Sequence, residues 1–102
     1  MAIEKQVLKS KPVCKVTFRL GKDQAKGADT VRLVGDFNNW DTSTGPMTRL
    51  KSGEFKETLY LDLGHAFAFR YLLDDETWIS DGEADRLEAT PYPDVRNSVV
   101  VT

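Results

Sequence analysis

The stretch that decides the fold lies at residues 34–41 and reads Val34-Gly35-Asp36-Phe37-Asn38-Asn39-Trp40-Asp41. A β-strand pattern runs directly into a turn sequence here, and the turn ends on a large aromatic ring. Asn38 and Asn39 tolerate left-handed backbone angles and bond their own main chain, so the pair predicts where the strand ends and in which direction Trp40 leaves it. A second tryptophan, Trp78, lies in another turn-like region, residues 74–78. Two indoles in polar surroundings indicate a recognition surface, because exposed clustered aromatic area generally marks one.

Outward from this stretch, the strongest periodicity along the chain is two, which is typical of half-buried strands. Apolar and polar side chains alternate over residues 14–20, 31–37, 55–63 and 67–73, and shorter strands are expected at 47–50, 78–79 and 98–102. Gly64 and His65 separate two of these segments, which predicts a hairpin between 55–63 and 67–73. Residues 81–96 are expected to be largely irregular. No long window has a helical period, so we predict an all-β, immunoglobulin-like antiparallel β-sandwich.

The length of 102 residues predicts one domain, large enough to bury a core without disulfides or metals. Residues 1–12 are polar and expected to be a flexible lead-in, and residues 13–102 are expected to form the sandwich. Fourteen basic residues nearly balance sixteen acidic ones, which argues against a nucleic-acid partner. The single cysteine, Cys14, shares the parity of core residues and favours a reducing, cytoplasmic location. No apolar run approaches the roughly 18 residues that cross a bilayer, so no membrane partner is expected.

Acidic residues are numerous near the second tryptophan and raise the question of glycosidase chemistry. They are Asp74, Asp75, Glu76, Asp81, Glu83 and Asp85. Hydrolysis needs two carboxyl groups roughly 5 to 9 Å apart across a cleft that encloses the sugar, and a sandwich this small has little depth to supply one. His65 has no catalytic partner and is too isolated for a metal cluster, and no phosphate-binding loop is visible. We therefore expect a protein that is not an enzyme and uses no cofactor or metal.

Three segments of the chain resemble the signature of the family 48 carbohydrate-binding modules. These are Gly35-Asp36-Phe37-Asn38-Asn39-Trp40, Phe69-Arg70-Tyr71-Leu72-Leu73-Asp74 leading to Trp78, and Asn97-Ser98-Val99-Val100-Val101. Such modules are early-set immunoglobulin-like domains, found in the glycogen-binding part of AMP-activated protein kinase β subunits and at the N-terminus of isoamylases and glycogen branching enzymes. The resemblance covers about residues 13–102, and the order and spacing of three segments make it specific.

The resemblance implies a sugar site at Trp40, Arg70, Trp78 and Asn97. Where the kinase modules have lysine, this chain has Arg70, which keeps the charge and adds donors in a planar fork. The kinase-type loop that closes over the sugar is replaced by residues 90–96, and its leucine has no clear counterpart. Tyr92 in this segment is a candidate for an additional aromatic contact.

The chemistry of these residue types points the same way. A glucose ring presents C–H groups as a weakly apolar patch and hydroxyls around its rim, so a binder needs aromatic faces and polar side chains. Arg70 has the parity opposite to Phe69 and Tyr71 and is expected to point outward. Ordinary structural roles remain open for each residue. Trp40 could cap the sandwich end, Trp78 could pack on Tyr71 or Leu72, Arg70 could pair with Tyr60 or an acid, and Asn97 could bond backbone at the entrance to the last strand.

The sequence therefore predicts non-catalytic binding of an α-glucan such as glycogen, starch or maltooligosaccharide. A separate glycogen-metabolising enzyme or kinase is a candidate partner that the module would bring to the polymer. The alternative is a structural or protein-interaction early-set domain without sugar binding, whose partners dock on a sheet face or an exposed edge strand. Exposure of both tryptophans on one side, with Arg70 between them, would favour sugar binding.

Overall fold

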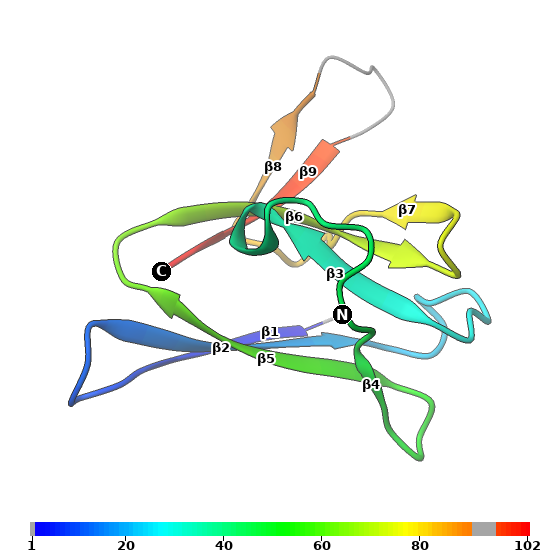
Figure 1. Ribbon diagram of the computed structural model, residues 1–102, viewed down its shortest axis with the longest axis horizontal. Coiled ribbons are helices and arrows are strands. Elements are labelled where there is room, and N and C mark those ends of the chain that lie inside the picture. Colours follow the sequence, from blue (N-terminus) through cyan, green and yellow to red (C-terminus); the bar gives the residue numbers. More distant parts are fainter. Residues whose placement is uncertain (1, 91–95) are drawn as a thin grey trace.

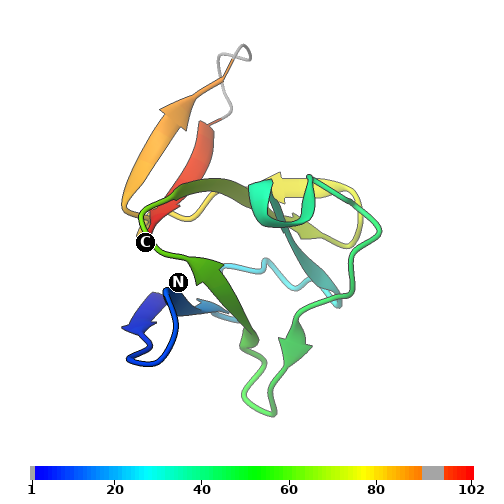
Figure 2. The same cartoon turned by 60° about the vertical axis from the view of Figure 1, so that its left-hand side comes forward.

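The fold is an antiparallel β-sandwich of two sheets, seen in a computed structural model that describes residues 2–90 and 96–102 (Figures 1 and 2). The first sheet has the order β1-β2-β5-β4, formed by β1 (Ala2–Val7), β2 (Val13–Leu20), β5 (Phe55–Asp62) and β4 (Thr48–Arg49). The second has the order β3-β6-β9-β8, formed by β3 (Val31–Gly35), β6 (Ala66–Leu73), β9 (Arg96–Val101) and β8 (Arg86–Ala89), with β7 (Thr77–Ile79) also paired to β6. A short 3-10 helix, η1 (Asp36–Asn38), follows β3. The predicted all-β sandwich is confirmed.

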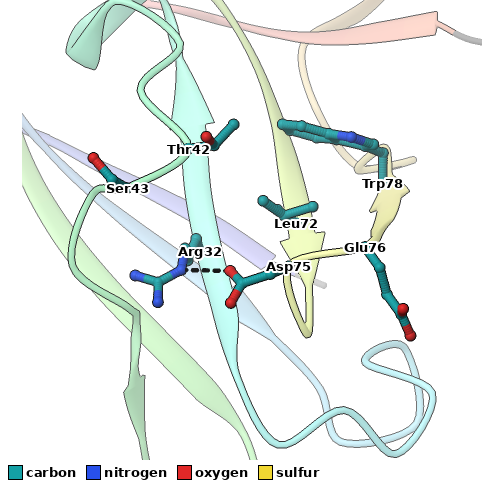
Figure 3. Close-up of a pocket in the computed structure, with 7 residues that line it drawn as sticks. All are labelled: Arg32, Thr42, Ser43, Leu72, Asp75, Glu76 and Trp78. Atoms are coloured by element: carbon teal, nitrogen blue, oxygen red, sulfur yellow. Dashed lines mark hydrogen bonds and ion pairs between the residues drawn. The ribbon is translucent and has the colours of Figure 1, made fainter.

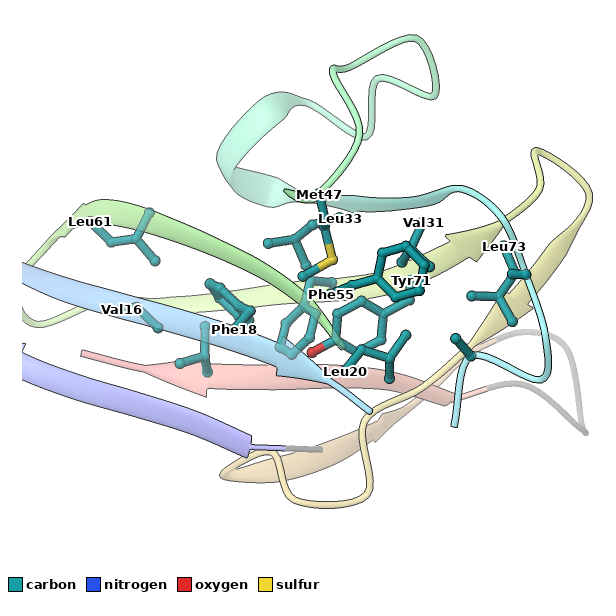
Figure 4. Packing of buried hydrophobic residues seen from close by; sticks show 14 of the residues in the cluster. Val16, Phe18, Leu20, Val31, Leu33, Met47, Phe55, Leu61, Tyr71 and Leu73 are labelled. Atoms are coloured by element: carbon teal, nitrogen blue, oxygen red, sulfur yellow. The ribbon is translucent and has the colours of Figure 1, made fainter. Parts of the chain in front are cut away.

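The core lies between the two sheets and is built from the side chains that alternate inward (Figure 4). Phe18 of β2 meets Phe69 of β6 edge to face, with ring centroids 5.1 Å apart, and Phe69 meets Tyr71 in the same way at 5.8 Å. Edge-to-face aromatic pairs add to the stabilisation that burial alone supplies. Cys14 is buried in this cluster, which confirms its interpretation as a small core residue.

The predicted hairpin between residues 55–63 and 67–73 is wrong, because β5 lies in the first sheet and β6 in the second. Gly64, whose φ is 77°, turns the chain from one sheet to the other instead of folding it back alongside itself. The turn is held from outside: the Leu63 N–H donates to the Pro12 carbonyl oxygen at 3.2 Å, and the Thr102 N–H donates to that of His65 at 2.8 Å. Alternation shows which side chains of a strand face the core, but it does not show to which of the two sheets that strand belongs.

Two segments without a clear strand pattern in the sequence form edge strands. Ala2–Val7 was expected to be a flexible lead-in, but it is strand β1, paired along its whole length with β2. Arg86–Ala89 falls in the segment expected to be irregular, but it is strand β8, paired with β9, and all four of its side chains are exposed. Such edge strands carry little hydrophobic alternation because both of their faces are largely in solvent, so pattern analysis misses them.

Asp81, a buried residue of the β7–β8 connection, bonds this connection to β6 and β9. The Tyr71 hydroxyl donates to Asp81 Oδ2 at 2.8 Å, and the Asp81 N–H donates to Ser98 Oγ at 2.6 Å. All three residues are buried. Burial, and then the neighbouring Asp81 charge, raise the pKa of the Tyr71 hydroxyl far above its ordinary value.

The raised pKa of Tyr71 predicts a loss of stability at alkaline pH. The unfolded chain releases the tyrosine proton near pH 10 whereas the folded chain keeps it, so the free energy of unfolding should fall above about pH 10 by about 1.4 kcal/mol per pH unit. Denaturant melts at about pH 9, 10 and 11 measure this slope. Tyr71→Phe should be less stable at neutral pH, because Asp81 loses a donor, but should show a shallower alkaline fall. Equal slopes in both proteins would contradict the prediction.

Candidate functional site

The face of the second sheet that is turned away from the core, called the outer face below, carries the side chains of opposite parity to Phe69 and Tyr71. Register pairs Val34 of β3 with Arg70 of β6, and pairs Leu72 with Arg32 of β3 on one side and with Trp78 of β7 on the other. Val34, Leu72 and Val99 are buried although none of them belongs to the core cluster. The outer face therefore carries a second set of buried apolar side chains beneath its polar and aromatic ones, and is not a plain solvated surface.

Trp78 stands on this face directly opposite Leu72. Figure 3 shows its ring edge-on above Leu72, extending from β7 toward Thr42. Trp78 as a residue is 41% exposed. Of the two structural roles considered for Trp78, packing on Leu72 is compatible with this position, and packing on Tyr71 is not, because Tyr71 faces the core. Much of Trp78 stays accessible.

The hairpin that carries Trp78 is tied to β3 by its turn residues. Asp74 and Asp75 both have positive φ values, 49° and 60°, which cost energy for residues other than glycine. The Asp74 carboxylate accepts from the Asp29 and Thr30 N–H groups at 2.9 and 3.0 Å, and Asp75 Oδ1 accepts from Arg32 Nε at 2.8 Å. These contacts offset the backbone cost and fix the hairpin, and with it Trp78, against the neighbouring strand.

The turn after β3 ends the strand as predicted. Asn38 Nδ2 donates to the Leu33 carbonyl oxygen at 2.9 Å, and Asn38 Oδ1 accepts from the Gly35 N–H at 3.0 Å. Asn39 and Trp40 then take left-handed angles, with φ of 57° and 56°. The asparagines thus stop β3 and set the direction of Trp40.

A carboxylate orients the ring of Trp40. Trp40 Nε1 donates to Asp36 Oδ1 at 2.8 Å, while Asp36 Oδ2 accepts from the Ala68 N–H of β6, also at 2.8 Å. Trp40 is half-buried and lies outside the core cluster. Neither indole pairs with another aromatic ring among the residues that the structure describes. The hydrogen bond from Nε1 to Asp36 therefore fixes the orientation of the Trp40 ring.

Arg70 and Asn97 form one hydrogen-bonded unit between β6 and β9. Arg70 Nε donates to Asn97 Oδ1 at 2.7 Å, and both side chains are half-buried. Partial burial lowers the pKa of Arg70, although the guanidinium stays charged. Arg70 does not pair with Tyr60, which lies in the other sheet. A guanidinium has five N–H donors, and the bond to Asn97 uses one of them.

Register brings the site residues into one order along β6. Trp40 is linked through Asp36 to Ala68, Arg70 follows two residues later, and Leu72 with Trp78 follows two residues after that. Arg70, with Asn97 beside it, therefore lies between the attachment points of the two tryptophans. Tyr92, the candidate for an additional contact, lies outside the described residues.

An open groove adjoins Trp78, and three of its residues, Arg32, Thr42 and Ser43, are not among the candidates that the sequence singles out. Its lining is formed by Arg32, Thr42, Ser43, Leu72, Asp75, Glu76 and Trp78, and its volume is about 540 Å³ (Figure 3). Arg32 alternates outward on its strand, which was a signal that could have drawn attention to it. Thr42 and Ser43 come from a loop whose position depends on tertiary contacts, so no sequence pattern indicates them.

Four of the six acidic residues near Trp78 have structural partners. Asp81 is buried against Tyr71, Asp74 binds backbone N–H groups, and Asp75 pairs with Arg32. Asp85 accepts from Lys5 Nζ at 2.6 Å and from the Val101 N–H at 2.7 Å. Over residues 2–90 and 96–102, no group of three histidine, cysteine or acidic residues is arranged to hold a metal ion, and no helix is long and apolar enough to span a membrane.

One sheet face thus carries an exposed tryptophan beside an arginine–asparagine pair, and a second tryptophan is oriented by a carboxylate at the end of β3. Aromatic faces combined with a few fixed polar groups suit a small-ligand binding site. Residues 13–93 match the family model of carbohydrate-binding module 48, the isoamylase N-terminal domain, and the chain belongs to that family. The family consists of binding modules that are not catalytic. A comparison with curated proteins gives no match.

Proposed function

We propose that this domain binds α-glucan, such as glycogen, starch or maltooligosaccharide, on the outer face of its second sheet and without catalysis. The family supports carbohydrate binding in general. The observation that carries the finer proposal is the Arg70–Asn97 pair, joined at 2.7 Å and lying between the attachment points of Trp40 and Trp78.

The chemistry of an α-1,4-linked glucan suits this arrangement. The polymer curves, so two aromatic rings set apart on one face can each take a sugar while polar groups between them reach the hydroxyls. Arg70 has N–H donors left after its bond to Asn97, and the Asn97 amide supplies both donors and an acceptor. Each stack contributes about 1 kcal/mol beyond area burial and is opposed by ordering costs, so we expect a Kd of roughly micromolar to millimolar.

The biological role that fits such weak binding is recruitment. A module of this affinity would bring a partner, such as a glycogen-metabolising enzyme or a kinase, to a polymer that offers many adjacent sites. A cytoplasmic location belongs to the same proposal and rests on the single free, buried Cys14, which fits a reducing compartment.

Isothermal titration tests the proposal. We expect heat from β-cyclodextrin and from maltoheptaose at millimolar concentration, and none from cellohexaose, whose β-1,4 linkages give a straight chain with a different spacing of ring faces. Absence of heat from all three would reject α-glucan binding and favour the alternative, a protein-interaction domain that has kept the sandwich alone. Equal heat from cellohexaose would show that the face does not select the α-linked curve.

A further inference from the structure

The groove beside Trp78 is distinct from the Arg70–Asn97 pair, although the two share the tryptophan ring. Arg70 precedes Leu72 on β6 and Asp75 follows it, while Trp78 stands opposite Leu72. The ring therefore separates two places on the same face. In Figure 3, Leu72, Arg32 and Asp75 all lie on one side of the edge-on ring, which is the side of the β6–β7 turn. One face of the indole is thus turned toward the groove.

The polar wall of the groove is held rigidly. Arg32 donates from Nε to Asp75 Oδ1 at 2.8 Å and from a terminal nitrogen to the Thr44 carbonyl oxygen. Its side chain is only 21% exposed, whereas that of Asp75 is 61% exposed. A guanidinium has five N–H donors, so these two bonds leave donors unused, and the Asp75 carboxylate keeps acceptor capacity. The wall offers both kinds of hydrogen-bonding group, fixed in place before a ligand arrives.

Charge and size define what the groove would accept. Asp75 neutralises Arg32, and Glu76 adds a further negative charge to the lining, which disfavours an anionic ligand. The groove instead suits a neutral polyhydroxyl compound, because it offers an aromatic face, a neutralised ion pair and the hydroxyl groups of Thr42 and Ser43. The volume of about 540 Å³ falls within the range typical of small-ligand sites, roughly 300 to 1,000 Å³.

We propose that this groove is a second sugar subsite, which holds a further glucose unit of the same α-glucan chain on the turn side of Trp78. The sugar ring stacks on the groove side of the indole, and its hydroxyls bond to Arg32 donors and to the Asp75 carboxylate. This inference rests on the proposed function and adds a length dependence to it: chains long enough to pass Trp78 gain contacts that short chains lack.

Two variants and a matched control test the subsite by titration with maltotriose and maltoheptaose. Thr42→Arg places a long side chain from an exposed loop position into the groove, next to Asp75 and Glu76. It should raise the Kd for maltoheptaose by about fivefold and change the Kd for maltotriose by less than about twofold. Asp75→Asn keeps the shape of the side chain, and asparagine tolerates the left-handed backbone angle at this position. This variant should raise the Kd for maltoheptaose by about threefold. Thr48→Arg, at an exposed threonine of the first sheet, should bind both ligands as the unchanged protein does.

The outcomes separate the two proposals. If the unchanged protein binds both oligosaccharides and neither groove variant alters the preference for the longer chain, the subsite is rejected while glucan binding stands. If the unchanged protein binds no oligosaccharide, both proposals fall together. Thermal melts of each variant show whether a loss of affinity comes from unfolding.

Discussion

Trp78→Ala is expected to weaken maltoheptaose binding by at least about tenfold, and to remove retention on immobilised glycogen. Trp78 is 41% exposed, and its ring stands at the boundary between the groove and the Arg70–Asn97 pair. In the proposed binding mode, its removal takes away a stacking surface on each side, while Arg70, Asn97 and the turn carboxylates stay in place. Affinity electrophoresis and titration measure the loss.

Stability distinguishes a binding residue from a core residue. Since Trp78 covers Leu72, its removal should cost only about 1 kcal/mol of folding free energy, a fall in Tm of about 4–8 °C. Tyr60→Ala is the matched control, because Tyr60 is an aromatic residue 61% exposed on the first sheet. It should leave glucan affinity unchanged. A Trp78→Ala protein that binds normally, or one that is largely unfolded at 25 °C, would contradict this assignment.

Gly35→Ala is expected to destabilise the fold severely, by about 3 kcal/mol or more, with a fall in Tm of about 10 °C or more. An added Cβ at Gly35 would lie 2.4 Å from the Ala68 carbonyl oxygen and 2.7 Å from Phe69 Cβ. Both atoms belong to β6, which is paired with strands along both edges and buries Phe69 and Tyr71 in the core, so it cannot shift without breaking those contacts. The strain would fall on the place where Asp36 bonds to the Ala68 N–H, so the orientation of Trp40 should suffer as well.

A glycine in the following loop gives the control. A Cβ at Gly45 meets no atom within 4 Å, so Gly45→Ala should melt close to the unchanged protein. Circular dichroism melts of both variants, followed by glycogen retention of whatever remains folded, make the comparison. A Gly35→Ala protein within about 2 °C of the unchanged one would show that β3 and β6 can separate more easily than their packing indicates.

The strand faces could be predicted because burial imposes a period of two on the sequence. Phe18, Phe69 and Tyr71 were placed inward and Arg70 outward from alternation alone, and all four have those orientations. The end of β3 was equally predictable, because Asn38 bonds backbone groups within five residues of itself and Asn39 takes the left-handed angle that asparagine tolerates. Such local interactions are present in the sequence itself.

The pairing of the strands could not be predicted in the same way. Residues 55–63 and 67–73 alternate as hairpin partners do, yet they belong to opposite sheets, since an inward face looks the same from either side of the core. Strand β1 was hidden for a related reason. An edge strand such as Ala2–Val7 is held by backbone hydrogen bonds to β2, so its sequence needs little apolar alternation.

The amino-acid sequence by itself determined the all-β character, the inward and outward faces, and the motif that names Trp40, Arg70, Trp78 and Asn97. Tertiary structure decided where those side chains stand, because their partners are distant along the chain. The Asp36 carboxylate that orients Trp40 is itself held by the Ala68 N–H of β6, 32 residues away. Asn97 meets Arg70 across 27 residues, and Arg32 meets Asp75 across 43. Alternation and turn preferences report interactions between near neighbours, whereas a binding surface is made by contacts that exist once the sheets have assembled.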